Sequence, residues 1–420
     1  MSVECGLRAV GTGMSRESSA RRLRWGELLM PVVPGPVLAL GVTQIIGFGS
    51  LYYAFGVLVA PMSTDLAISP TLAYGLLSVA LLAGSLAAPL AGRLVDRRGA
   101  RVMMAAGSVA SAFALAAVAL APNWQALLAA LILAEVVAPL VLYDAAFAAL
   151  AEAAGQARAR LAITQMTLLG GFASTLFWPL TLWLQTVWGW REAFLVFAAL
   201  HLLVCLPLHL TLPRSGATGH KADPTPPPFA PLPARHHRRA MALLAVGLSV
   251  GWVVFSAFSA QWVPALTALG LTEGAAVAAG ALMGPAQVGA RVIEMVFAAH
   301  RHPIFTALIA MASVVLALIV LILGPSGILT ASVFAVLFGV GQGLGTVVRG
   351  TLPLALFGPL GFGARLGRLA SLRMLVAALA PFAMAGSLAL FGPMVTLILA
   401  AVLAQLALAA YGALPWRATE

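Results

Sequence analysis

The sequence from Gly92 to Arg101, Gly-Arg-Leu-Val-Asp-Arg-Arg-Gly-Ala-Arg, places four arginines and one aspartate between two long apolar runs, residues 72–91 and 102–121. Apolar runs of this length are typical of membrane-spanning helices. Charges at this density are costly in hydrocarbon, so we predict that the segment is a tight aqueous turn between two spanning helices. Gly92 and Gly99 suit such a turn, because glycine reaches positive φ values that a β-carbon disfavours.

The composition indicates an integral membrane protein. Of 420 residues, 61% are hydrophobic and only 9% are charged. The formal charge of +11 would suggest a nucleic-acid partner in a soluble protein. Here almost all arginines fall in alternate loops, with Arg191 as the exception, which is the positive-inside pattern. The sequence therefore predicts a multi-pass protein with both termini and the long central loop in the cytoplasm, and it gives no reason to expect a nucleic-acid partner.

The decapeptide resembles the signature loop between the second and third helices of the major facilitator superfamily of secondary transporters. The matching positions are Gly92, Leu94, Asp96, Arg97, Gly99 and Arg101. The alternative is a solvated basic loop with no further meaning. The resemblance implies an all-α membrane protein with twelve transmembrane helices in two pseudo-symmetric six-helix bundles. With little lysine and much arginine and alanine, the composition suggests a bacterial inner-membrane protein.

The hydropathy pattern divides the chain into two halves. Arg93 to Asp96 aligns with Arg291 to Glu294 as a degenerate second copy of the signature loop, as expected for two parallel repeats. The predicted organisation is a cytoplasmic tail (1–30), an N-terminal six-helix bundle (31–213), a proline-rich cytoplasmic linker (214–239), a C-terminal six-helix bundle (240–415) and a short cytoplasmic tail (416–420).

Polar and aromatic residues mark one face of the first helix. Gln44, Phe48 and Tyr52 follow at four-residue steps, so a regular helix places them on one face. We predict that this face lines a central substrate cavity; the alternative is packing against neighbouring helices. The first helix also resembles that of bacterial monocarboxylate-transporter-like members of the superfamily.

Two carboxylates lie in the predicted fourth helix, residues 124–150. A carboxylate within the membrane indicates a functional site by default, so Glu135 is the first candidate for proton coupling and Asp144 the second. The alternative for Glu135 is a structural hydrogen bond. At 100° per residue the two side chains fall on opposite faces, so we expect no paired acid and base. Tyr143 is a candidate substrate contact or helix contact.

The resemblance also implies a conformational latch. An acidic residue near Glu152 is expected to pair with an arginine of the loop, and Asp96 is expected to face the inner end of the eleventh helix. The latch candidates are Gly92, Asp96, Arg97, Gly99, Arg101, Glu152, Arg291 and Glu294. The last two lie three residues apart on one helical face and are interpreted as a cytoplasmic gate pair, with a substrate clamp as the alternative.

The second half offers fewer polar candidates. Ser256 and Gln342 lie in predicted helices seven and ten, and we expect them to contact substrate, although helix packing explains the neighbouring glycines as well. Arg349, at the predicted inner end of helix ten, is interpreted as a snorkelling arginine, with attraction of an anionic substrate as the alternative. His236 and His237 adjoin each other in the linker without further metal ligands, so we predict no metal site.

The functional hypothesis is a secondary transporter that works by alternating access, is driven by protons and exports a toxic compound or metabolite, as drug and arsenical exporters do. The alternative is uptake or exchange of a monocarboxylate or another organic anion. A polytopic receptor or membrane enzyme is the hypothesis of a different class. The sequence contains no phosphate-binding loop and no catalytic motif. We expect no cofactor and no enzymatic activity, a small-molecule substrate, protons and the bilayer as partners, and a monomer.

Overall fold

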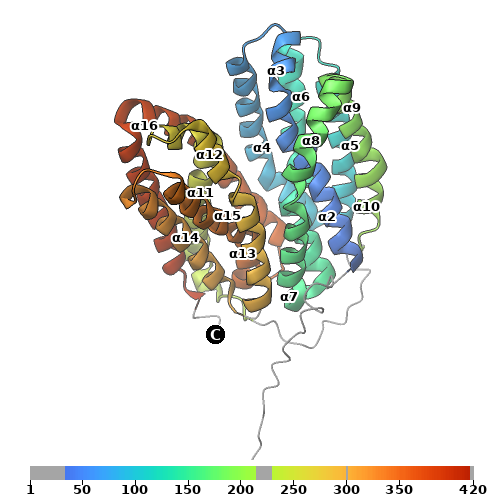
Figure 1. Cartoon of the computed structure of the whole chain (residues 1–420). Coiled ribbons are helices and arrows are strands. Elements are labelled where there is room, and N and C mark those ends of the chain that lie inside the picture. The colour runs from blue at the N-terminus through green and yellow to red at the C-terminus, as the bar shows by residue number, and fades with distance from the viewer. Residues whose placement is uncertain (1–33, 214–228, 299–300, 417–420) are drawn as a thin grey trace, which may run out of the picture.

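The computed structural model describes residues 34–213, 229–298 and 301–416, and the predicted N-terminal tail and most of the linker lie outside this part. Two helical bundles stand side by side (Figure 1). The first bundle contains α2 (Pro34–Phe48), the π-helical turn η1 (Gly49–Tyr53), α3 (Ala54–Asp65), α4 (Pro70–Arg98), α5 (Ala100–Ala119), α6 (Trp124–Val137), the 3₁₀ turn η2 (Ala138–Leu140), α7 (Tyr143–Gly170), α8 (Ala173–Val187), α9 (Trp190–Leu200), the π-helical turn η3 (His201–Cys205) and α10 (Leu206–Leu210).

The second bundle has α11 (Ala234–Thr267), α12 (Glu273–Gly280), α13 (Met283–Phe297), α14 (Pro303–Leu323), α15 (Ile328–Phe357) and α16 (Phe362–Gly412). In the described residues, 11 helical segments are long and apolar enough to cross a membrane. The last of them has 51 residues, about twice what one crossing needs. Gly392 breaks it with a φ of 77°. This segment is therefore two spans, and the fold is the predicted arrangement of twelve.

The linker is shorter than predicted. His236 and His237 lie within the first turns of α11, which begins at Ala234. A proline at residue 233 precedes the helix, and proline is well tolerated where a helix starts because its missing N–H is not needed there. Within the described residues, no group of three or more histidine, cysteine, aspartate or glutamate side chains could hold a metal ion.

The signature stretch is more helical than predicted. α4 continues through Arg98, and only Gly99, with a φ of 84°, separates it from α5. Arg97 and Arg98 occupy the last turn of α4, where cations are stabilised by the helix dipole. Gly92 therefore lies inside α4 and not in the predicted turn. A β-carbon there would lie 2.1 Å from the carbonyl oxygen of Gly363, so this glycine lets α4 approach α16.

The fourth span is broken where a continuous helix was predicted. Pro139 lies in η2, and proline removes a helical N–H and clashes with the preceding turn. The chain becomes helical again at Tyr143. The angular argument that put Glu135 and Asp144 on opposite faces is therefore wrong, because the two residues belong to different helices. Asp144 lies in the first turn of α7, where the helix dipole favours a carboxylate.

Candidate functional site

Three charged residues join the bundles near the break in the fourth span. Asp144 of α7 accepts hydrogen bonds from Nε and Nη2 of Arg349 in α15, at 3.0 and 2.5 Å. Nη2 of Arg373 in α16 lies 3.7 Å from the same carboxylate. The interpretation of Arg349 as a snorkelling residue is wrong, because α15 extends two turns beyond it and its side chain is only 9% exposed.

Arg373 is the least satisfied member of this group. It is buried, yet among the described residues no acceptor lies within hydrogen-bonding distance of its guanidinium. Its guanidinium lies 4.8 Å from the ring centroid of Trp252 in α11, a cation–π contact. At 3.7 Å its ion pair with Asp144 is too long for a hydrogen bond, so Arg373 keeps donors for another acceptor.

An aromatic cluster in the first bundle faces these arginines. The ring of Tyr143 lies 4.5 Å from Phe48 and stacks at 5.3 Å on Phe147. Arg349 lies 5.8 Å from the Tyr143 ring. Tyr52 lies 6.5 Å from Phe48 and is close enough to Arg373, in the other bundle, for the two to interact electrostatically. Tyr52 is nevertheless 59% exposed, so neighbouring protein covers less than half of its side chain.

Glu135 lies near the same tyrosine. Its side chain is buried, and no hydrogen bond or ion pair between described residues includes it. It lies within electrostatic range of the Tyr52 hydroxyl, which also interacts with Arg373. Glu135 and Asp144 therefore lie near one group of residues, the first next to Tyr52 and the second paired with Arg349. On the other side Glu135 packs against α4, where a β-carbon on Gly84 would lie 2.6 Å from its carbonyl oxygen.

Gln44 does not line a cavity. It is fully buried, and its Nε2 donates a 2.8 Å hydrogen bond to the carbonyl of Val141. The break at η2 leaves that carbonyl without a regular helical partner, and Gln44 supplies one. The shared face predicted for Gln44, Phe48 and Tyr52 is interrupted, because the π-helical turn η1 begins between the second and the third of these residues.

The two polar candidates of the second bundle bond within their own bundle. Ser256 donates to the carbonyl of Ala377 at 2.9 Å. Gln342 accepts from Nε2 of Gln287 at 3.1 Å. These contacts hold α11 to α16 and α13 to α15, so the structure gives both residues a packing contact where a substrate contact was expected.

The bundles also join where α4 meets the start of α16. The carboxylate of Asp96 accepts from the backbone N–H groups of Gly363 and Ala364, at 2.8 and 2.7 Å. These are free donors at the N-terminus of α16, where a negative charge is favourable. Asp96 thus lies at the N-terminal end of the eleventh span, the helix to which the resemblance assigns it. A β-carbon on Gly367 would lie 2.4 Å from the carbonyl oxygen of Ala88, so the helices touch along two turns.

A second junction involves Glu294 and Arg291 of α13, but they do not pair with each other. Glu294 pairs with Arg160 of α7 at 2.5 Å and also accepts from Thr306 at 3.3 Å. Arg291 donates to the carbonyl of Thr167 in α7 at 3.0 Å. Both residues lie at the predicted gate. They do not bond to each other, and each bonds to its own partner in α7 of the first bundle. Figure 1 shows α7 and α13 side by side at this end of the molecule.

A histidine lies next to the second junction. His302, outside the spanning helices, caps α14 by accepting from the backbone N–H of Ile304 through Nδ1. Its Nε2 is buried without a partner among the described residues. Burial, and after it the positive charge of Arg160, lowers the pKa of His302 to about 4.

The remaining latch candidates do not form the predicted lock. Glu152 and Arg97 are exposed, and no ion pair between described residues includes either of them. Arg101 donates instead to the carbonyl of Leu212 within its own bundle, at 3.2 Å. Gly99 stays in the short turn, as expected.

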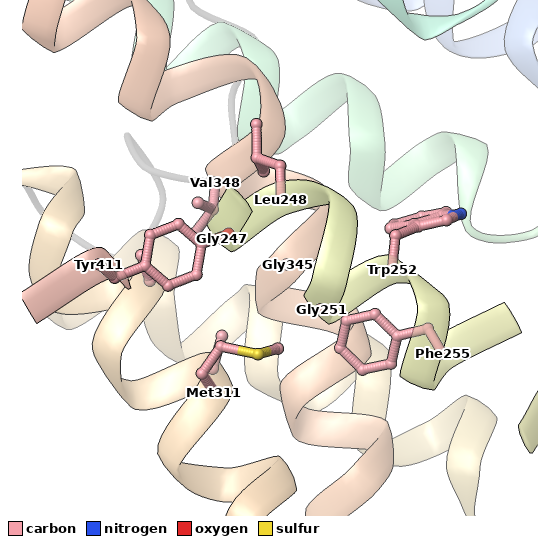
Figure 2. A pocket seen from close by; sticks show the side chains of 11 residues that line it. Gly247, Leu248, Gly251, Trp252, Phe255, Met311, Gly345, Val348 and Tyr411 are labelled. Atoms are coloured by element: carbon pink, nitrogen blue, oxygen red, sulfur yellow. The ribbon is translucent and has the colours of Figure 1, made fainter. Parts of the chain in front are cut away.

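Two small pockets adjoin the site. One, with an empty volume of about 240 Å³, lies between the bundles and is lined by Gly92, Asp144 and Gly363 among others. The other, of about 280 Å³, lies inside the second bundle (Figure 2). Trp252 and Tyr411 are at its two ends. Because only one bundle lines the second pocket, it cannot be the site that both bundles expose alternately.

Sequence reasoning missed Arg373 and Arg160 as site residues. Arg373 had a signal, because it lies inside the predicted eleventh helix, where a charge is as significant as at Glu135. The sequence gives no such signal for Arg160, because it looks like any other basic residue near a loop.

Comparisons with known proteins agree with this architecture. The family model described as Major Facilitator Superfamily matches residues 40–357. Among solved structures, the human organic anion transporter MFSD10 (TETRAN) is similar with a TM-score of 0.67 and 17% identity, over 90% of this chain and 98% of that one. The proton:xylose symporter XylE, bound to 6-bromo-6-deoxy-D-glucose, is similar with a TM-score of 0.69 and 14% identity, over 90% and 95%. A search of curated proteins gave no match.

At these identities the solved structures support the fold alone, whereas the family model covers most of the chain. Twelve spans in two bundles, the signature stretch at the contact of α4 with α16 and the family match all agree. The chain belongs to the Major Facilitator Superfamily, a family of secondary transporters.

Proposed function

We propose that this protein transports a small organic monoanion, such as a monocarboxylate, by alternating access, with Arg373 as the residue that binds the anionic group. The observation that carries the proposal is the unsatisfied state of Arg373. A buried cation whose ion pair is as long as 3.7 Å is incompletely compensated, whereas a bound carboxylate would supply up to two hydrogen bonds in a bidentate geometry.

The charge balance supports one anionic group in the substrate. Arg349 is satisfied by Asp144, and Arg291 donates to backbone and hydroxyl oxygens. Arg373 is the arginine of this group that lacks a hydrogen bond within the described chain. Trp252 and Tyr52, which lie near Arg373, offer ring surfaces for the apolar part of such a substrate. MFSD10, a structural relative by fold, is described as an organic anion transporter.

We propose Glu135 as the proton carrier. A buried carboxyl group without an ion pair or hydrogen-bond partner is stable only when neutral, and Glu135 lies beside the same tyrosine that interacts with Arg373. Proton and anion would then be carried through one space between the bundles. For the direction of transport we keep the export predicted from the sequence, and vesicles with opposite pH gradients test it.

The decisive experiment measures uptake into proteoliposomes of ¹⁴C-labelled lactate and benzoate and of the neutral amides of both. We expect transport of the acids alone. Arg373→Ala should raise KM about 10- to 100-fold, because one charge-assisted hydrogen bond contributes about 1.5–3 kcal/mol. Arg368→Ala is the matched control, since Arg368 is an exposed arginine of the same helix. Equal transport of acids and amides, or unchanged KM in Arg373→Ala, would refute the proposal.

A further inference from the structure

Two π-helical turns meet inside the first bundle. One is η1, in the first span, and the other is η3, in the sixth. A π-turn accommodates an extra residue in a helix, is less favourable than regular helix and occurs often at functional sites. The two turns are linked by Ser50 of η1 and His201 of η3, both almost fully buried. Neither side chain takes part in the anion site described above.

The hydrogen bonds fix which group donates. The Ser50 hydroxyl donates to the carbonyl of Ile46 at 2.7 Å. Because its one hydrogen is used there, Ser50 Oγ accepts from Nε2–H of His201, at 2.9 Å. Nδ1 of His201 is buried without a partner among the described residues. His201 is therefore the neutral Nε2–H tautomer, and its described polar contact is the bond to η1.

A second contact confines η1 from another helix. A β-carbon on Gly49 would lie 2.0 Å from the ring of Phe177 in α8. The ring thus lies directly on the backbone of the turn. Between Phe177 and His201, η1 has little freedom to change to a regular α-helical turn.

The π-turn ends with two tyrosines that lie within electrostatic range of arginines of the second bundle. Tyr52 interacts electrostatically with Arg373, and Tyr53 interacts with Arg291. In a regular α-helix, adjacent residues point about 100° apart. The wider π-turn reduces that angle, because it contains more residues. The shape of η1 therefore lets two consecutive phenols approach arginines of the opposite bundle.

We propose that His201 is a positioning residue for substrate binding: through Ser50 it holds η1 in the π-helical form that presents Tyr52 to the anion bound at Arg373 and keeps Tyr53 beside Arg291. The inference rests on the proposed function of Arg373. It adds a residue that touches no substrate and acts through the shape of the first span.

The kinetic test compares His201→Phe with His201→Gln, whose side-chain amide can donate near the position of Nε2. We expect His201→Phe to raise the KM for benzoate about tenfold with a much smaller change in Vmax, and His201→Gln to restore most of the loss. Ser50→Ala should reproduce His201→Phe, and the double variant should be no worse than either single variant.

The matched control is His209→Phe. His209 is equally buried, lies two turns away on the same span and bonds to Ser108 of α5 at 2.7 Å, not to the first span. It should lower thermal stability as His201→Phe does and leave KM unchanged. If His209→Phe and His201→Phe raise KM alike, or if neither does, the inference is wrong.

A second readout does not depend on transport. In a Tyr52→Cys variant, the rate of labelling by a membrane-impermeant thiol reagent reports how far position 52 faces the space between the bundles. Adding His201→Phe should slow labelling about tenfold, and adding His209→Phe should not. If benzoate is not transported but labelling changes as expected, the proposed function fails and the positioning role stands. If labelling and KM are both unchanged, the positioning role fails.

Discussion

Replacing Gly92 with alanine should separate the bundles where α4 meets α16. The new β-carbon would lie 2.1 Å from the Gly363 carbonyl oxygen, whereas ordinary contacts begin at 3.4 Å. The helices must therefore separate by about 1.3 Å, the difference between these distances. The two hydrogen bonds of Asp96, at 2.8 and 2.7 Å, would then exceed bonding distance.

Bonds that involve a charged group each contribute about 1.5–3 kcal/mol, so their joint loss disfavours this conformation by roughly 3–6 kcal/mol. Every 1.4 kcal/mol is a factor of ten, so the population should shift at least about 100-fold toward states in which this end is open. The conformation that the structure describes would then be a minor one.

Pulsed electron spin resonance measures the shift directly. Spin labels at Arg98 and Arg368, both exposed, should give a short distance in the parent protein and a longer one in Gly92→Ala. Gly75→Ala is the matched control, because Gly75 lies in the same helix and a β-carbon there meets nothing within 4 Å. A short distance that persists in Gly92→Ala would refute the claim that close helix approach holds this end shut.

Glu135→Gln should abolish pH-driven accumulation of benzoate while leaving benzoate exchange at equal pH intact, since only the proton carrier is lost; accumulation at the parent level would remove Glu135 from coupling. Arg160→Ala leaves Glu294 buried without its cation, which typically costs 3–5 kcal/mol, so the spin-label distance should lengthen as in the glycine variant, and the exposed Arg158→Ala should have no effect. The pKa of His302, lowered to about 4, lies below its ordinary value of 6.5, so the folded state resists protonation and the melting temperature should fall as pH drops from about 6.5 to 4. His302→Asn, which can still cap the helix, should flatten that dependence, and a slope equal to the parent's would contradict the assignment.

The fold was predictable because its signals are local. The signature stretch and the apolar runs identify spanning helices by length and charge alone. The twelfth span is identified in the same way, because α16 is long enough for two spans and is broken at Gly392. These features depend on the bilayer as solvent and not on which helix packs against which.

The candidate site was less predictable because it depends on interruptions of helices. The break at Pro139 puts Glu135 and Asp144 beside one group of residues, and a calculation for a continuous helix separates them. Arg349 was misread because α15 extends beyond its predicted end. Gln44 looked like a cavity residue, but it bonds to a carbonyl that only the break leaves free.

Pairings across the two bundles could not be predicted from spacing. Arg291 and Glu294 lie on one helical face, which suggested a pair, yet each finds its partner in α7 more than a hundred residues away. Short-range rules describe neighbours on one helix. They contain no information on the register between two bundles, which packing at glycines such as Gly92 and Gly367 determines.

The claim that Arg373 binds the anionic group of the substrate is tested most directly by equilibrium binding of ¹⁴C-labelled benzoate to the purified protein, with unlabelled benzoate and benzamide as competitors. We expect benzoate to compete and benzamide not to compete, and we expect Arg373→Ala to weaken binding at least tenfold while Arg368→Ala binds as the parent does. Benzoate binding of parent strength in Arg373→Ala, or equal competition by the neutral amide, would contradict this account.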